Sequence, residues 1–171
     1  SRPADSFLAN EPIPHRADLV SQVIARECVI VSRGEDLPDK GYSFDRIIID
    51  APCTGLGALR RRPEARWRRS PQDLKELILI QKELLRAGIS MLKPNGLLTY
   101  VTCSPHILET KAQVIEVLHK HPELELVDIA PLLNQEVRKE AVLSDGTMQL
   151  WTHLDNSDSM FMALFHKKNQ I

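Results

Sequence analysis

The sequence lacks several features that would place the protein in a class at once. It has three cysteines, an odd number without a pairing pattern, which argues against a disulfide framework and favours a reducing compartment. It has no apolar run long enough to span a membrane, and no signal-peptide segment follows Ser1. The net charge of −1 excludes a globally basic surface, so any nucleic-acid contact must come from a local patch. A cytoplasmic protein is expected.

The composition is that of an ordinary folded domain. The chain has 171 residues, of which 43% are hydrophobic and 26% charged, enough to bury a core within one domain. It does not begin with methionine and enters an apolar segment almost at once. This beginning indicates a piece of a longer protein.

Strands and helices are expected to alternate along the chain. Apolar β-branched runs predict strands, and apolar residues at helical spacing predict helices. Ser70, Pro71 and Asp73 are typical of a helix start, and Pro94-Asn95-Gly96 of a helix end. The expected strands are 6–10, 28–32, 44–50, 97–102, 124–129, 148–151 and 159–166, and the expected helices are 15–27, 70–92 and 107–121. The runs 28–32, 44–50 and 97–102 have the composition of strands buried on both faces.

This alternation predicts an α/β fold with a mainly parallel sheet, in which ligands bind at the carboxyl ends of the strands. Three expected strand ends carry polar or reactive residues. They are Asn10-Glu11, Asp50-Ala51-Pro52-Cys53 and Thr102-Cys103-Ser104. A functional site is therefore expected at this edge of the sheet.

Cys53 and Cys103 can each be interpreted in more than one way. A single cysteine just past a strand is most often a small buried side chain. Two cysteines at equivalent strand ends, with Asp50 close to one of them, favour chemistry. The sequence has no Cys-x-x-Cys pair, and His106, His119, His121 and His153 form no ligand pattern, so no metal site is expected.

Two segments resemble a known family. Residues 50–57, Asp-Ala-Pro-Cys-Thr-Gly-Leu-Gly, resemble motif IV of the RNA (cytosine-5) methyltransferases, and residues 98–104, Leu-Thr-Tyr-Val-Thr-Cys-Ser, resemble their motif VI. Residues 60–70 with the leucine-rich helix that follows, and the tail 150–161, resemble the bacterial Sun/Fmu branch, which methylates a cytosine of 16S ribosomal RNA. Ser159 stands where that branch usually has glycine.

The resemblance implies a Rossmann-like S-adenosylmethionine-dependent methyltransferase fold with an antiparallel last strand. It implies that Cys103 attacks carbon 6 of cytosine, which turns carbon 5 into a nucleophile for the methyl group. Cys53 is implied to assist product release, Asp50 to contact the base, and Pro52 to shape the turn that presents them. The alternative interpretation of Asp50 is an ordinary turn or cap aspartate.

The resemblance also implies S-adenosylmethionine as cofactor. Glu11 is expected to bind its ribose, either Glu35 or Asp36 its adenine, and Asp50 with Pro52 to border the same site. The family's glycine-rich first motif does not occur in the sequence, so it is expected before residue 1, together with the first strand and an RNA-binding domain. Residues 1–171 are then a partial catalytic domain, inactive alone, that binds cofactor weakly and self-associates through unpaired strand edges.

Ribosomal RNA is the expected partner. Arginines crowd one short segment beside motif IV and make a local basic patch, in which a tryptophan is available to stack on an unpaired base. The alternative is a solvated loop with its tryptophan anchored in the core. The resemblance also implies that Glu109 caps or orients the turn after Cys103. The patch consists of Arg60, Arg61, Arg62, Arg66, Trp67, Arg68 and Arg69.

Two other functions remain open. A methyltransferase-like module that binds RNA without catalysis would be free to lose the thiol of Cys103. A DNA cytosine-5 methyltransferase would use the cysteine of the Pro-Cys pair, here Cys53, as its nucleophile. The Thr102-Cys103-Ser104 strand end favours RNA.

Overall fold

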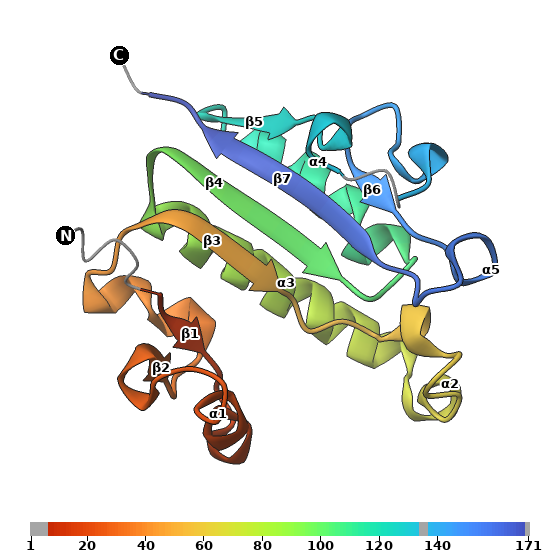
Figure 1. The fold of residues 1–171 in the computed structure, drawn as a ribbon, viewed down its shortest axis with the longest axis horizontal. Helices are drawn as coiled ribbons and strands as arrows, with labels where there is room; N and C mark the ends of the chain where they lie inside the picture. Colours follow the sequence, from red (N-terminus) through yellow and green to blue (C-terminus); the bar gives the residue numbers. More distant parts are fainter. Residues whose placement is uncertain (1–6, 134–136, 170–171) are drawn as a thin grey trace. The chain divides into compact units, whose positions relative to one another are not determined.

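The computed structural model describes residues 7–133 and 137–169 of the chain (Figure 1). The chain divides into two compact units, Ser1–Tyr42 and Ser43–Ile171. None of the helices in the described ranges is long and apolar enough to cross a membrane.

The first unit is small. Strand β1 (Ala9–Asn10) pairs in parallel with β2 (Val29–Ile30), and the Asn10 side chain donates to the Ser32 carbonyl at 2.8 Å. Helix α1 (Pro14–Val20) lies between them in sequence. Three short 3-10 helices complete the unit, η1 (Arg26–Cys28), η2 (Gly34–Asp36) and η3 (Pro38–Lys40).

The elements of the first unit are shorter than predicted. Helix α1 ends at Val20, whereas the apolar spacing predicted a helix over 15–27. The hydroxyl of Ser21 donates to the Asp18 carbonyl at 2.8 Å, and the N–H groups of Gln22 and Val23 then donate to carbonyls only three residues before them. The prediction rested on Leu19, Val20, Val23 and Ile24. Leu19 and Val23 are 59% and 86% exposed and the other two are only half-buried, so little packing supports a longer helix. The predicted strands 6–10 and 28–32 are reduced to two residues each, and Ser6 lies outside the described residues.

The second unit contains a five-stranded sheet in the order β3-β4-β7-β5, with β6 paired to β7. Strands β3 (Phe44–Asp50) and β4 (Leu92–Thr102) are parallel. Strand β7 (Phe161–Lys167) runs antiparallel to β4, β5 (Leu124–Val127) and β6 (Met148–Gln149). The predicted α/β fold, with parallel strands and an antiparallel last strand, is confirmed.

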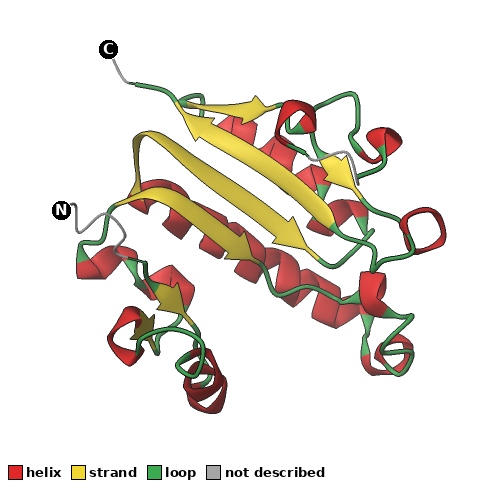
Figure 2. Cartoon of the chain, in the orientation of Figure 1, coloured by secondary structure: helices red, strands yellow, loops and turns green. Residues whose placement is uncertain are grey.

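Helices α3 (Pro71–Met91) and α4 (Lys111–Lys120) cover one face of this sheet (Figures 1 and 2). Their apolar side chains pack with those of the central strands into the main core, which includes Leu85, Val117 and Tyr100. The remaining elements are short: η4 (Leu56–Ala58), α2 (Ala65–Arg68), η5 (Ile107–Glu109), η6 (Ala130–Leu132), η7 (Lys139–Ala141) and α5 (Thr152–Asp155).

Helix α3 begins where the sequence predicts. The Ser70 hydroxyl accepts the Asp73 N–H at 3.2 Å, and the Asp73 carboxylate accepts the Ser70 N–H at 2.6 Å. This reciprocal capping box satisfies two backbone donors that the first turn leaves unpaired. Helix α3 also ends before Pro94-Asn95-Gly96, as predicted, at Met91. The strand that follows begins earlier than the predicted 97–102, because Pro94-Asn95-Gly96 lies inside β4 as an irregularity at which Asn95 has a positive φ of 60°.

Two further predictions are corrected by the second unit. Strand β3 is not buried on both faces, since Ile48 is 76% exposed while Ile49 is 9% exposed. Within the described sheet β3 pairs only with β4, and alternate side chains of a strand point to opposite faces. The predicted helix 107–121 begins as η5 and continues as α4, because Thr110 between them has a non-helical ψ of −105°.

Candidate active site

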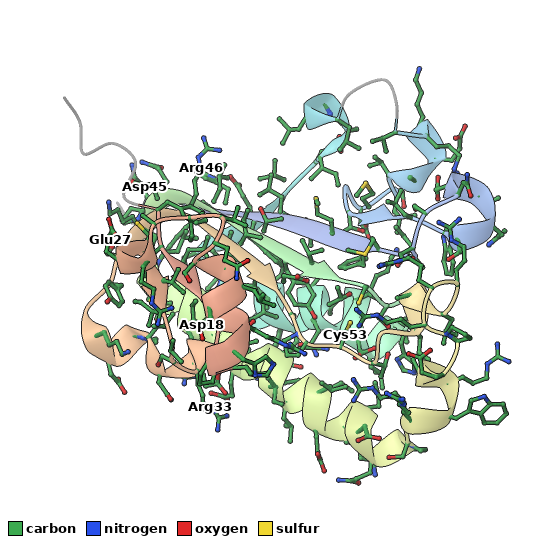
Figure 3. All side chains as sticks on the ribbon, turned by 60° about the horizontal axis from the view of Figure 1, so that its bottom comes forward. Asp18, Glu27, Arg33, Asp45, Arg46 and Cys53 are labelled. Carbon is green, nitrogen blue, oxygen red and sulfur yellow. The ribbon has the colours of Figure 1, made fainter. Side chains whose placement is uncertain are left out.

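The two cysteines predicted to carry the chemistry lie in contact. Cys53 follows β3 and Cys103 follows β4, and these neighbouring parallel strands end at the same edge of the sheet. The two sulfurs are 3.2 Å apart. Cys53 is buried and Cys103 is half-buried, so the second thiol is the more accessible one. Figure 3 shows Cys53 in the chain that continues past the end of β3.

Backbone contacts hold the two cysteine turns together. The Ala51 N–H donates to the Val101 carbonyl and the Gly57 N–H to the Cys103 carbonyl, both at 3.0 Å. A Cβ on Gly57 would lie 2.0 Å from the Ser159 oxygen and 2.8 Å from the Cys103 oxygen. Gly55 has a φ of 71°, which favours glycine for a different reason. Gly57 is therefore required by the close approach of the Cys103 turn and of Ser159, and Gly55 by its left-handed backbone.

The contact between the two sulfurs shifts the pKa values of the two thiols in opposite directions. The thiol of Cys53 donates to Cys103 and lowers the pKa of Cys103 to about 7, against the opposing effects of burial and of the charges on Asp50 and Asp158. The same hydrogen bond, together with burial, raises the pKa of Cys53. Cys103 is therefore the thiolate of the pair near neutral pH, and Cys53 its hydrogen-bond donor.

A cavity of about 350 Å³ opens beside Cys103. Thr54 and Gly55 of the first cysteine turn border it, and Arg62, Arg68 and Arg69 supply positive charge. The cavity therefore combines an accessible thiolate with groups that bind phosphate.

The structure divides the predicted basic patch into two groups. Arg60 donates to the Asn156 side chain at 2.9 Å and Arg61 pairs with the Asp158 carboxylate, so both tie the segment to the loop before β7. Arg62, Arg66, Arg68 and Arg69 are exposed. Trp67 is 83% exposed, so the alternative in which it anchors the loop in the core is wrong.

The remaining residues predicted around the base lie close by. Asp50 is exposed at the end of β3, and its charge acts on the Cys103 thiol. Pro52 is also exposed, and its carbonyl accepts the side-chain amide of Gln81 at 2.9 Å.

The predicted cofactor residues are divided between the two units. Asp50 and Pro52 belong to the second, and Glu11, Glu35 and Asp36 to the first. Glu11 is half-buried and accepts the Ile13 N–H at 2.9 Å, which occupies one carboxylate oxygen.

The two acids predicted to compete for the adenine differ in their surroundings. Glu35 accepts from the Arg33 guanidinium at 2.9 Å. Burial opposes its ionisation, but a backbone hydrogen bond and Arg33 outweigh burial and lower the pKa of Glu35. Asp36 is exposed.

Sequence reasoning missed the buried polar residues behind the two thiols. Gln81 and Gln113 are 0% and 2% exposed and are hydrogen-bonded to each other at 3.3 Å. Gln81 also donates to Glu109 at 3.1 Å. Each glutamine lies among apolar residues at helical spacing, and a polar residue on that face was the available signal.

The histidines form no metal site with their neighbours. No group of three or more His, Cys, Asp or Glu side chains in the described part of the chain is arranged to hold a metal ion. His121 instead contacts Glu123 at 3.0 Å, and His106 accepts the Leu108 N–H at 3.2 Å.

Comparison with known proteins identifies the family of this chain. The family model for the 16S rRNA methyltransferase RsmB/F matches residues 2–166. The chain belongs to this RsmB/F family. The matched range contains the Asp-Ala-Pro-Cys and Thr-Cys-Ser segments, which are the two turns that bring the sulfurs into contact.

Relatives in the RsmB/F family are longer than this chain. Rv1407 of Mycobacterium tuberculosis (strain H37Rv), which is named a methyltransferase, is 46% identical over 161 residues. The match covers 93% of this chain and 34% of Rv1407. The ribosomal RNA small subunit methyltransferase B of Pectobacterium carotovorum is 36% identical over 124 residues, 72% of this chain and 26% of its own length.

Solved structures share the fold. PH0851 superposes with a TM-score of 0.82 at 29% identity, covering 94% of this chain and 36% of PH0851. NSun6 from Pyrococcus horikoshii, solved with SFG, superposes with a TM-score of 0.79 at 22% identity, covering 95% of this chain and 41% of NSun6.

Proposed function

We propose that this chain carries the catalytic centre of an S-adenosylmethionine-dependent methyltransferase that modifies carbon 5 of a cytosine in small-subunit ribosomal RNA. The observation that carries the proposal is the 3.2 Å contact between the Cys53 and Cys103 sulfurs, with Cys103 lining a cavity bordered by arginines. Two thiols in contact, one of them buried as a donor and one open to a cavity, suit a reaction that needs a nucleophile and a second proton-transfer group.

Cys103 is the nucleophile in this proposal. It lines the cavity and is the more exposed of the two cysteines, and its pKa of about 7 leaves a large thiolate fraction near neutral pH. The thiolate adds to carbon 6 of cytosine while the ring nitrogen N3 gains a proton or a hydrogen bond, which leaves carbon 5 electron-rich. Asp50, exposed at the end of the neighbouring strand, is assigned to the base edge that becomes charged.

Cys53 is assigned to the release of the product. The pKa of the Cys53 thiol is raised mainly by its hydrogen bond to Cys103, then by burial and by the Cys103 charge. Once Cys103 is bound to carbon 6 as a thioether, it carries no charge and is a poor acceptor. Two of these causes then disappear, so Cys53 ionises more readily and removes the proton from carbon 5. Cys103 leaves with its electron pair as the ring double bond re-forms, and N3 gives up the proton that it gained on attack.

S-adenosylmethionine supplies the methyl group when it is bound. The residues assigned to it suit its hydroxyl and amino groups, because Glu11 has a second carboxylate oxygen and Asp36 is exposed. Asp36 is the better candidate for the adenine, since Glu35 is committed to Arg33. The Pyrococcus horikoshii NSun6 structure contains SFG, an analogue of this cofactor.

RNA binding is assigned to the exposed part of the arginine segment. Arg62, Arg68 and Arg69 line the cavity beside Cys103 and are placed to bind phosphates next to the target base. Trp67 is exposed and offers a stacking surface for a neighbouring unpaired base. Arg60 and Arg61 are assigned a structural role, because Asn156 and Asp158 already bind them.

Covalent trapping tests this proposal. The complete gene product that contains this chain is incubated with small-subunit ribosomal RNA containing 5-azacytidine, and the protein–RNA adduct is measured on a denaturing gel. The wild-type protein and the Cys53→Ala variant are expected to form the adduct, and the Cys103→Ala variant is not. With unmodified RNA and cofactor, Cys53→Ala is expected to accumulate an adduct that the wild-type protein resolves.

Other results would favour the rival functions. Loss of the adduct in Cys53→Ala and its retention in Cys103→Ala would assign the attack to Cys53, as in DNA methyltransferases. Binding of RNA without any adduct in the wild-type protein would indicate an RNA-binding module without catalysis.

Residues 1–171 alone are proposed to be inactive and to bind the cofactor weakly. The family's glycine-rich first motif does not occur in this sequence, and the assigned acids are divided between two units. Isothermal titration of residues 1–171 with S-adenosylmethionine tests this directly. Binding in the micromolar range would contradict it.

A further inference from the structure

The carboxylate of Glu109 lies fully buried behind the two cysteines. Its side chain is 0% exposed, and its four hydrogen-bond partners are all neutral donors. Oε1 accepts the Thr54 N–H at 2.8 Å and the Gln81 amide at 3.1 Å. Oε2 accepts the hydroxyls of Thr54 and Ser104, both at 2.6 Å. A carboxylate is uncommon in such a position unless every acceptor site is used.

These partners come from the two turns that carry the thiols. Thr54 directly follows Cys53, and Ser104 directly follows Cys103. The single carboxylate therefore binds the neighbour of each cysteine, and its Oε2 joins the two hydroxyls.

A second tie comes from helix α3. The Gln81 amide that donates to Glu109 also donates to the Pro52 carbonyl at 2.9 Å, on the other side of Cys53. Gln113 of α4 in turn donates to the Gln81 side-chain oxygen at 3.3 Å. Cys53 is thus fixed through the residue before it and the residue after it.

We infer that Glu109 is a positioning residue for the two thiols, holding the turn that carries Cys53 against the turn that carries Cys103. Its carboxylate hydrogen-bonds to Thr54, Ser104 and Gln81 rather than to either sulfur, and it acts through these three residues. The effect of this positioning on catalysis rests on the proposed function. Its effect on the geometry of the two thiols does not.

A positioning role and a purely electrostatic role for Glu109 predict opposite changes in thiol pKa when Glu109 is replaced. The negative charge of Glu109 is one of the smaller causes that raise the pKa of Cys53. Removing a nearby negative charge lowers the pKa of a thiol, whereas separating Cys103 from its donor raises the pKa of Cys103. The direction of the change in a variant therefore distinguishes positioning from charge.

The test is alkylation of Cys103 by iodoacetamide as a function of pH, followed by peptide mass spectrometry to separate Cys103 from the other cysteines. It needs neither RNA nor cofactor, so it succeeds or fails independently of the proposed methyltransferase activity. In the wild-type protein the rate is expected to rise with pH about a midpoint near the Cys103 pKa of about 7. Glu109→Ala is expected to raise this midpoint by about one unit or more, because the thiols are no longer held in contact.

Glu109→Gln is the conservative control. Its carbonyl oxygen still accepts from Thr54 and Gln81, and its amide donates to the two hydroxyls, which can turn and accept. It is expected to keep the wild-type midpoint. Val117→Ala removes buried methyl groups from the main core without a tie to either cysteine, and it too is expected to keep the wild-type midpoint despite a loss of stability.

A double variant tests whether Glu109 acts through the sulfur contact. In a Cys53→Ala background the donor is already absent, so adding Glu109→Ala is expected to cause no further shift. If Glu109→Ala does not fold, Thr54→Val decides instead, because it removes one tie and keeps the backbone N–H bond. A wild-type midpoint in the folded Glu109→Ala or Thr54→Val protein, or an equal further shift in the Cys53→Ala background, would overturn the inference.

Discussion

The thiol of Cys53 is expected to set the pH at which Cys103 becomes reactive. Cys53→Ala removes the donor that is the largest cause of the low Cys103 pKa. Burial and the charges of Asp50 and Asp158 remain, and all three favour the neutral thiol. The pKa of Cys103 should therefore move from about 7 back toward the ordinary value of 9.0. Because thiolate attack requires deprotonation, the pH profile of adduct formation should move upward with it.

The size of the effect follows from two opposing factors. A shift from about 7 to 9.0 reduces the thiolate fraction of Cys103 at neutral pH from about one half to roughly one hundredth. A thiolate of higher pKa is also more nucleophilic, by roughly tenfold over two units at a Brønsted coefficient of about 0.5. The variant should therefore react at most about fivefold more slowly near pH 7, equally fast near about pH 8, and faster above it.

Single-turnover adduct formation with 5-azacytidine RNA, followed from about pH 6 to about pH 9.5, measures this crossing of the two profiles. Cys53→Ser is the matched control, because its hydroxyl still donates toward Cys103 and should keep most of the downward shift. Equal midpoints in the wild-type and Cys53→Ala proteins would refute the view that the sulfur contact activates Cys103. A Cys53→Ala profile that is lower at every pH would instead indicate lost geometry.

Three further changes have defined outcomes. Gly57→Ala places a Cβ 2.0 Å from the Ser159 oxygen, and a loss of about 1–3 kcal/mol in the free energy of unfolding is expected by urea denaturation; an unchanged midpoint would contradict the close approach. Trp67→Ala should weaken RNA binding by about 1–3 kcal/mol at unchanged Tm, since the ring is 83% exposed, and a lowered Tm would instead indicate a packing role. Arg68→Gln should lower the slope of log affinity against log salt by about 0.7, the contribution of one phosphate contact on a single strand, and an unchanged slope would remove this residue from the RNA surface.

The sequence was sufficient to predict the elements whose bounds depend on interactions between residues close together in the chain. The Ser70 capping box and the Pro71 start of α3 follow from side-chain-to-backbone bonds within four residues. Strand β3 has the bounds that its run of isoleucines predicts. The predicted helix 15–27 is shorter in the structure because it depends on tertiary packing. Apolar spacing stabilises a helix only where those side chains pack, and Val23 is 86% exposed.

The site itself was only half available from the sequence. The residue types at the strand ends predicted that Cys53 and Cys103 would belong to one site, since parallel neighbouring strands end at one edge of the sheet. The sequence could not say which thiol is buried, because burial depends on what packs around each turn. Nor could it say that Arg61 is bound to Asp158, which lies 97 residues away along the chain.

What the sequence alone determined is the chemistry available at the sheet edge: two thiols, an aspartate and a run of arginines, each recognisable from neighbours in the chain. What only the tertiary structure decided is how these groups differ from one another. The 3.2 Å sulfur contact, the open cavity on the Cys103 side and the buried Glu109 behind it join residues from separate elements. Distances between such residues are set by packing of strands and helices, and no local pattern encodes them.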